Sequence, residues 1–307
     1  MVDRVQDERG LRSRCETAFN VRLSSVHDID EGASSRNFVA EEVGGRRFLI
    51  KVVADVATAR LLTARFRLLD GINGVRCLFD GKVLEFEGRG VFALSYCDGK
   101  EIHFEDYTSS RISELLAFYR KFSELIQTAT DTLDVYDLVS MRGAIESDSK
   151  RTHDRAVLGF LDEMPVEALT YRPEKTRVIH GDFHYANFRF GPEGVAGVFD
   201  LRDFRTAYPA DDMVRLVLCS AERMRWYKWL AYRRLFRNFG ELVRRSGYPQ
   251  DEWLVAINGY FIRKLYKRFK RHRRIGFWMR LNLRMRAVFY RRFRTIVAES
   301  CLRGRES

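Results

Sequence analysis

Residues 180–187 read His-Gly-Asp-Phe-His-Tyr-Ala-Asn, and Asp200 follows Asn187 by thirteen positions, at the end of the apolar run 195–199. Phosphoryl transfer from a nucleotide needs a carboxylate that orients the attacking hydroxyl and oxygen ligands for a Mg²⁺ ion that bridges the phosphates. An Asp and an Asn five positions apart in one loop can face one cavity, with Asp182 toward the acceptor and Asn187 toward the metal. Asp200 on the following hairpin then completes a metal site.

The alternative is structural, because Asp and Asn commonly cap turns and Asp commonly ends a strand. For an isolated Asp-x4-Asn pair this alternative is favoured, since short motifs carry a high false-positive risk. The joint pattern of Asp182, Asn187 and Asp200 favours phosphoryl-transfer chemistry instead.

A longer ordered match covers residues 180–213, where His-Gly-Asp-x-His-x-x-Asn is followed by Phe-Asp-x-x-Asp and Pro-Ala-x-Asp-Met. This order resembles the aminoglycoside phosphotransferase and choline kinase group, which are ATP-dependent small-molecule kinases with a protein-kinase-like fold. The resemblance implies that Asp182 is the catalytic base, that Asn187 and Asp200 bind Mg²⁺, and that His180 and Asp212 support the catalytic loop. The matching residues are His180, Gly181, Asp182, His184, Asn187, Asp200, Asp203, Pro209, Ala210, Asp212 and Met213.

The N-terminal half resembles the same family at residues 32–38, Gly-Ala-Ser-Ser-Arg-Asn-Phe. Small residues in a phosphate-covering loop let backbone N–H groups approach the phosphates. The resemblance implies that Ser34, Ser35 and Asn37 bind the nucleotide and that Lys51 holds its α- and β-phosphates. Tyr96 then belongs to the hinge beside the adenine. An ordinary outward-facing lysine on an alternating strand is the alternative for Lys51.

The segment 56–69 departs from the family pattern, because kinases of this fold usually carry a Glu there that pairs with the strand lysine. It contains three arginines and no Asp or Glu. Either Glu41 or Glu42 serves Lys51, or the helix is misplaced, or nucleotide binding is impaired. A degenerate kinase-fold protein that acts as an anion- or membrane-surface-binding module is therefore the alternative function.

The predicted elements define an α+β class. Strands are expected at 36–43 and 46–53, joined by a Gly-Gly turn, and at 82–86 and 91–96. The segment 56–69 has apolar residues at helical spacing.

Long helical periods begin at 110–129, are interrupted by short strand runs within 177–201, and continue to the C-terminus. We therefore expect a two-lobed kinase-like fold, with a nucleotide-binding lobe at 1–97 and a catalytic and acceptor-binding lobe at 98–307.

The charge is concentrated at one end of the sequence. The chain has 54 Lys plus Arg and 42 Asp plus Glu, and residues 221–307 hold 24 and 6 of them, a balance of +18. The first 220 residues therefore carry 30 against 36. Such a basic end disfavours a polycationic acceptor and favours an anionic one. A solvated helix face is the alternative.

The expected acceptors are a phosphorylated sugar or the anionic sugar core of a lipopolysaccharide precursor, since lipopolysaccharide sugar kinases look like relatives of this fold. Arginines interleaved with Trp and Tyr also suit peripheral contact with an anionic membrane surface. No nucleic-acid-binding motif is readable.

The remaining composition points to a cytoplasmic protein, and the basic end adds the expectation of peripheral contact at the inner membrane. The opening residues lack a secretory signal, and no window approaches the roughly 18 apolar residues of a membrane-spanning helix. Five scattered cysteines without a CxxC pair argue against a disulfide framework or a zinc cluster.

Overall fold

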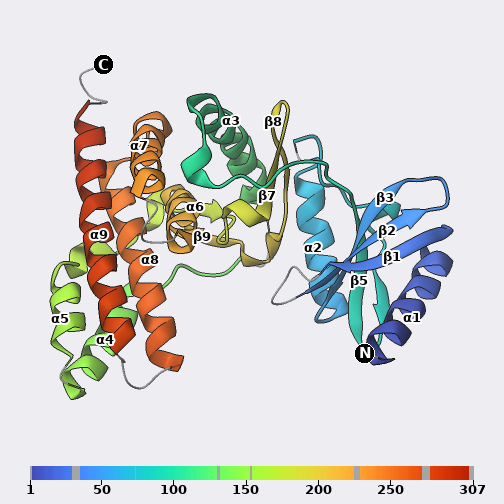
Figure 1. Cartoon of the computed structure of the whole chain (residues 1–307), viewed down its shortest axis with the longest axis horizontal. Helices are drawn as coiled ribbons and strands as arrows, with labels where there is room; N and C mark the ends of the chain where they lie inside the picture. The colour runs from blue at the N-terminus through green and yellow to red at the C-terminus, as the bar shows by residue number, and fades with distance from the viewer. Residues whose placement is uncertain are drawn as a thin grey trace. The chain divides into compact units, whose positions relative to one another are not determined.

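The computed structural model describes residues 2–29, 35–72, 74–129, 132–152, 154–224, 229–271 and 277–303. The chain forms two compact units, shown in Figure 1. The first contains Met1–Glu101, Glu124–Ala129 and Phe188–Arg202, and the second contains Ile102–Ser123, Thr130–Asn187 and Asp203–Ser307. The contiguous lobes expected from the sequence, 1–97 and 98–307, stay a prediction.

The first unit is built on an antiparallel five-stranded sheet with the strand order β1-β2-β3-β5-β4. Its strands are β1 (Leu23–Ile29), β2 (Arg36–Glu42), β3 (Arg47–Val53), β4 (Leu84–Phe86) and β5 (Arg89–Ser95). The β2–β3 hairpin turns at the expected Gly-Gly pair, where Gly45 has a φ of +83°. Both predicted hairpins are confirmed.

Two helices pack on this sheet, α1 (Val2–Phe19) and α2 (Val56–Leu68). Helix α1 was not predicted; it buries Leu11, Cys15 and Phe19, which are spaced four residues apart, against strand residues of the sheet. Helix α2 lies where the sequence predicted it, so the possibility that this helix was misplaced is excluded. Its N-terminus is capped by Asp55, which accepts a hydrogen bond of 2.6 Å from the Thr58 N–H.

A second hairpin, β7 (Phe188–Gly191) and β8 (Gly194–Val198), belongs to the first unit and leads directly to Asp200. The backbone groups of Lys100 and Phe190 exchange hydrogen bonds of 2.9 and 3.0 Å. A Cβ on Gly99 would lie 2.8 Å from the Cβ of Arg189, so a glycine is needed at this crossing. The hairpin is therefore fixed against the end of the segment 94–99.

The second unit is mainly helical. Its helices and strands are α3 (Ser109–Leu125), α4 (Leu138–Arg151), α5 (Arg155–Asp162), β6 (Arg177–Ile179), β9 (Arg205–Ala207), α6 (Pro209–Arg223), α7 (Trp229–Ser246), α8 (Gln250–Arg271) and α9 (Phe277–Arg303). The 3₁₀ segments of the chain are η1 (Phe79–Gly81), η2 (Phe104–Asp106), η3 (Ile126–Thr128), η4 (Val166–Leu169), η5 (Pro173–Lys175), η6 (Tyr185–Asn187) and η7 (Leu201–Asp203).

The basic end of the sequence forms α7, α8 and α9, which lie side by side in Figure 1. Helix α8 also packs on α6, and Trp253 in α8 is fully buried. Within the described segments, no helix combines the length and the apolar character that crossing a membrane requires.

Candidate active site

The motif 180–187 forms a loop in the second unit between β6 and η6. Its second residue, Gly181, has a φ of +77°, and a Cβ there would lie 1.9 Å from the carbonyl oxygen of Asp203. A side chain at this position would therefore meet both an unfavourable backbone conformation and a steric clash. The local geometry explains why the motif has glycine here.

Asp212, in the first turn of α6, fixes this loop by hydrogen bonds to its backbone. Its carboxylate accepts hydrogen bonds of 2.8 Å from the His180 N–H and 2.9 Å from the Gly181 N–H. The hydroxyl of Tyr119 donates a third, of 2.8 Å. Burial and the nearby Asp212 charge raise the pKa of Tyr119, so its hydroxyl stays protonated as a donor. The carboxylate thus satisfies buried backbone donors and fixes the path of the loop.

His180 is fully buried and packs against the rings of Phe122, Phe183 and Phe204. Its Nδ1 accepts a hydrogen bond of 3.2 Å from the Asp182 N–H. The imidazole therefore holds the backbone of Asp182.

Asp182 is surrounded by cationic and hydrogen-bonding groups. An Arg215 Nη2 contacts its Oδ1, and His184 Nε2 lies 3.6 Å from its Oδ2. Burial raises the pKa of Asp182, but the hydrogen bond from His184 and the charge of Arg215 outweigh burial and hold that pKa well below its usual range. Asp182 is therefore a carboxylate at neutral pH, as a group that orients a hydroxyl must be.

Asn187 is nearly buried and is oriented by the same loop. Its Nδ2 donates a hydrogen bond of 2.8 Å to the carbonyl oxygen of Asp182. Because the amide nitrogen is held in this way, Oδ1 is the atom left to act as a ligand. The loop thus joins Asn187 to the backbone of Asp182.

In the first unit, Lys51 lies on β3 and is 8% exposed, opposite Asn37 on β2. Burial lowers the pKa of Lys51, and the charge of Asp200 raises it. The charge of Asp200 therefore favours the protonated form of Lys51. Glu42 is 3.6 Å from Arg46 at the hairpin turn, away from the register position of Lys51.

Asp200 has a φ of +53°, a conformation uncommon for residues other than glycine. Both of its carboxylate oxygens are bound by Arg202, at 2.9 and 3.1 Å. Arg65 of α2 is 2% exposed and donates hydrogen bonds of 2.6 and 2.7 Å to the carbonyl oxygens of Leu201 and Arg202. Helix α2 therefore supplies a buried cation to the turn after Asp200.

The other expected nucleotide-binding residues also fall in the first unit. Ser35 precedes β2, Asn37 lies within it, and both are partly buried. Tyr96 follows β5, with the guanidinium of Arg47 4.3 Å above its ring. Ser34 lies outside the described residues. The first unit thus carries Ser35, Asn37, Lys51, Tyr96 and Asp200, and the second carries His180, Asp182 and Asn187.

Sequence reasoning missed two cations that act on Asp182. Arg215 follows Asp212 by three positions and so lies on the same face of α6. Lys267 comes from α8; desolvation and the charges of Arg215 and Lys264 lower its pKa, whereas Asp182 raises it. Helical spacing from Asp212 could have identified Arg215, but nothing in the sequence links Lys267 to the loop.

Among the described residues, no group of three or more His, Cys, Asp or Glu could hold a metal ion. A metal bound by Asn187 or Asp200 therefore needs further ligands, and nucleotide phosphates are such ligands in kinases.

The phosphotransferase enzyme family model matches residues 25–242. Solved structures with the same fold include an aminoglycoside phosphotransferase from Alicyclobacillus acidocaldarius, at 17% identity and a TM-score of 0.64, with 95% of each chain covered. An amicoumacin kinase in complex with AMP-PNP and Ca²⁺ shares 14% identity at a TM-score of 0.59, covering 97% of this chain and 96% of its own. An aminoglycoside phosphotransferase from Streptomyces rimosus shares 19% identity at a TM-score of 0.56, covering 87% and 99%. A comparison with curated proteins finds no match.

The chain therefore belongs to the phosphotransferase enzyme family, the family that contains the aminoglycoside phosphotransferases expected from the sequence. The α+β, protein-kinase-like fold and the enzyme class, a kinase that phosphorylates a hydroxyl group, are confirmed.

Proposed function

We propose that this enzyme transfers the γ-phosphoryl group of ATP to a hydroxyl of a sugar or related small acceptor, with Mg²⁺ as the metal. The observation that carries the proposal is the catalytic loop, in which Asp182 is ionised, oriented by His180 and joined to Asn187. Asp182 would orient the acceptor hydroxyl and accept its proton. Mg²⁺ would supply neutralisation of the phosphate charge.

The donor atoms fit a magnesium ion, which prefers oxygen ligands. Asn187 presents Oδ1, because its nitrogen is engaged by the Asp182 carbonyl. Asp200 accepts hydrogen bonds from Arg202, but both of its carboxylate oxygens retain lone pairs that could bind a metal. Asn187 and Asp200 would therefore hold the metal together with phosphate oxygens.

For the nucleotide, Lys51 would bind the α- and β-phosphates. Its burial removes water that would screen its charge, so the interaction with a phosphate gains strength. Ser34, Ser35 and Asn37 would cover the phosphates, and the backbone beside Tyr96 would contact the adenine.

The acceptor in this proposal is anionic. Arg215 and Lys267 place two positive charges near Asp182, and the basic segment 221–307 supplies one of them, Lys267. Among the solved structures with this fold are complexes with hygromycin B and enzymes named for aminoglycosides. A polycation of that kind would be repelled by these two charges, whereas a phosphorylated or carboxylated sugar would be attracted.

A phosphorylated sugar and the sugar core of a lipopolysaccharide precursor both have this chemistry. The second would be reached at the inner face of a membrane, where a basic helical surface would be attracted to anionic lipids. The proposed location is therefore cytoplasmic, with peripheral contact at the inner membrane.

The Asp182→Asn variant tests the reaction. We expect turnover to fall by roughly 10²- to 10⁴-fold, the usual contribution of an acid or base catalyst, while Mg-ATP still raises the melting temperature. Full activity in this variant would overturn the role of Asp182. A wild-type protein that binds Mg-ATP weakly or not at all and consumes no ATP with any acceptor would favour the alternative, a degenerate anion-binding module.

Acceptor charge is tested by measuring KM for anionic, neutral and cationic sugars with wild type, Arg215→Met and Lys267→Met. The two variants should raise KM for the anionic acceptors selectively, because they remove charge beside Asp182. Lys270→Met removes the same charge from the same helix, where Lys270 lies over the ring of Tyr266, and should leave KM unchanged. Preference of the wild type for cationic acceptors would refute an anionic acceptor.

A further inference from the structure

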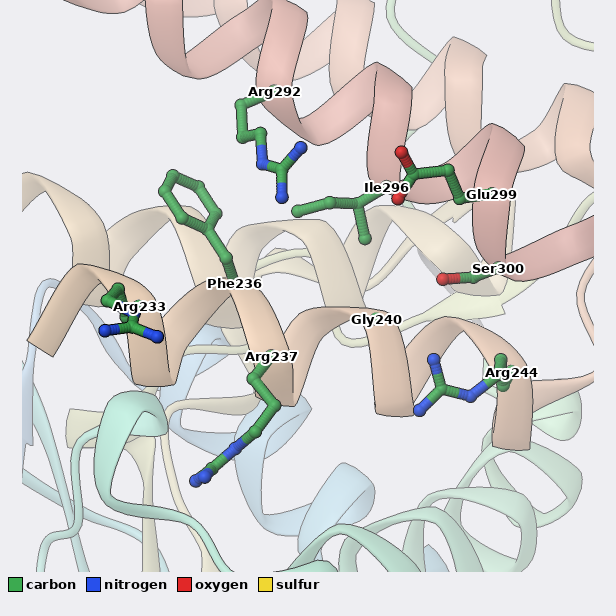
Figure 2. A pocket seen from close by; sticks show the side chains of 9 residues that line it. All are labelled: Arg233, Phe236, Arg237, Gly240, Arg244, Arg292, Ile296, Glu299 and Ser300. Carbon is green, nitrogen blue, oxygen red and sulfur yellow. The ribbon is translucent and has the colours of Figure 1, made fainter. Parts of the chain in front are cut away.

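Helices α7 and α9 enclose a pocket of about 310 Å³ in the second unit. Figure 2 shows Arg233, Arg237 and Arg244 on one helix and Arg292 on the other, with Phe236 and Ile296 between them. None of its lining residues belongs to the loop 180–187 or to the cations beside Asp182. The pocket is therefore separate from the groups proposed for phosphoryl transfer.

Small residues create the space between the helices. Gly240 has no side chain, and a Cβ there would lie 3.4 Å from both Ile296 Cγ2 and Ser300 Oγ. Arg233, Arg237 and Arg244 follow one another at intervals of four and seven positions, which places them on one face of α7. The two helices therefore approach closely at Gly240, and in Figure 2 Arg292 points from α9 toward α7 whereas Arg237 extends away from α9.

The arginines of the pocket differ from neighbouring arginines in their partners. On α7, Arg234 pairs with Asp106 at 3.0 Å and Arg245 pairs with Glu241 at 2.8 Å. On α9, Arg291 contacts both carboxylate oxygens of Glu163. These three arginines are sequence neighbours of the arginines that line the pocket, but each forms an ion pair with an acid.

Within the described residues, none of the four pocket arginines forms such an ion pair. Arg233 lies 5.7 Å from the Trp229 ring, and Arg237 reaches the Asn238 side-chain oxygen at 3.5 Å. Among the residues that the structure describes, Arg244 and Arg292 pair with no acid, and Glu299 is the one acid in the pocket lining. Several guanidinium groups line this pocket with a single carboxylate, and an anion bound among them would offset their mutual repulsion.

We propose that the α7–α9 pocket is a binding site for a phosphate-bearing ligand. Guanidinium groups match phosphate geometry with paired hydrogen bonds, and Phe236 and Ile296 offer apolar contact to the group that carries the phosphate. The volume accommodates a phosphate with part of a sugar or glycerol unit. Two sources share this chemistry: a free sugar phosphate and the headgroup of a phosphate-bearing lipid.

The surface next to the pocket has exposed apolar side chains that would suit a lipid ligand. Trp229 and Leu230, at the start of α7, are 59% and 58% exposed. An exposed Trp next to arginines is typical of a surface that contacts the headgroup region of a membrane. A free ligand would use the arginines alone.

The test uses glucose 6-phosphate in calorimetry for the free source and vesicles of phosphatidylcholine with phosphatidylglycerol in sedimentation for the lipid source. The variant is Arg244→Ala with Arg292→Ala. The control, Arg234→Ala with Arg245→Ala, changes the net charge equally and removes arginines that already have acid partners. Both variants retain the catalytic residues, and thermal unfolding confirms that each is folded.

We expect the pocket variant to lose at least about 10-fold in affinity for one of the two probes, and the control to stay within about 2-fold of wild type. Loss with glucose 6-phosphate identifies a soluble ligand, and loss with vesicles identifies a lipid headgroup. Equal losses in the two variants, or no binding of either probe by wild type at low salt, would overturn the proposal. Turnover should be the same in both variants, so failure here is distinguishable from failure of the proposed reaction.

Discussion

Asp212 and Arg65 are both buried charged side chains, and each binds the main chain of a functional loop. Asp212 accepts hydrogen bonds from the N–H groups of His180 and Gly181. Arg65 donates hydrogen bonds to the carbonyl oxygens of Leu201 and Arg202. The acid thus holds the loop that contains Asp182, and the base holds the turn that follows Asp200.

The two side chains carry opposite charges because the two loops present different backbone groups. The loop of Asp182 presents N–H donors to Asp212, and the turn after Asp200 presents carbonyl acceptors to Arg65. A buried charge is tolerated where hydrogen bonds replace the water it loses. A Glu in place of Arg65 would face two carbonyl oxygens and no donor. The absence of an acid on α2 is therefore consistent with the conformation of this turn, and it is not by itself a sign of a degenerate nucleotide site.

The largest effect should come from Asp212→Asn. The amide NH₂ would face a backbone N–H in place of an acceptor, and each buried group left unsatisfied costs about 1–3 kcal/mol. Because the lost bonds hold the loop of Asp182, we expect kcat to fall by about 10²-fold or more in addition to a lower melting temperature.

Asp211→Asn is the matched control for this variant. Asp211 is equally buried in the same turn of α6, but its partners are the side chains of Tyr171 and Arg263. It should lower the free energy of unfolding and leave kcat nearly unchanged at a temperature where the protein is folded. Equal losses of kcat in the two variants would show that Asp212 acts on stability alone.

Some of these features could be predicted from the sequence and others could not. The motif at 180–187 predicted the loop and its glycine, because these residues are local and the backbone geometry requires Gly181. Asp212 lies 32 positions after His180 in the chain, and its contact with the loop was expected only from the family resemblance. The hairpins and α2 were predictable for a similar reason, since turn residues and periodicity are local signals.

Other features depended on contacts that no local pattern encodes. Among residues 8–19 of α1, whose side chains the structure describes, the buried ones are Leu11, Cys15 and Phe19. So short an apolar stripe did not mark the segment as a helix of the sheet layer. Arg65 forms hydrogen bonds with residues that are more than 130 positions away, and the charges of Lys267 and Asp182 interact although they come from distant segments. Long-range partners of charged side chains require coordinates, because their sequence contexts are ordinary.

Arg65→Met should have the next largest effect. It removes both hydrogen bonds to the turn after Asp200, and loss of a group that orients a metal ligand typically costs 10- to 100-fold in metal affinity. We therefore expect Mg-dependent nucleotide binding, measured by calorimetry, to weaken about 10-fold, with a smaller loss for nucleotide without metal.

Two further substitutions separate positioning from stability. Arg65→Lys keeps a buried donor and should recover part of the Mg-dependent affinity. Arg60→Met removes an exposed arginine of the same helix and should change neither binding nor melting temperature. If Arg65→Met lowers the melting temperature but binds Mg-nucleotide like wild type, Arg65 stabilises the fold without orienting Asp200.

The smallest effect concerns the pH dependence of Asp182. A carboxylate whose pKa is lowered in the folded protein stays ionised as the pH falls, so its protonation limits activity only at low pH. Burial raises the pKa of Asp182 while His184 and Arg215 lower it, so Arg215→Met should raise that pKa and move the acidic limb of the kcat profile to higher pH. At saturating acceptor and neutral pH, kcat should change little.

Arg223→Met is the control, because it removes the same charge from α6, where Arg223 lies over the ring of Tyr185. It should leave the acidic limb of the kcat profile in place. Identical profiles for Arg215→Met and wild type would show that Arg215 does not set the ionisation of Asp182, and the cation beside the catalytic loop would then act on the acceptor alone.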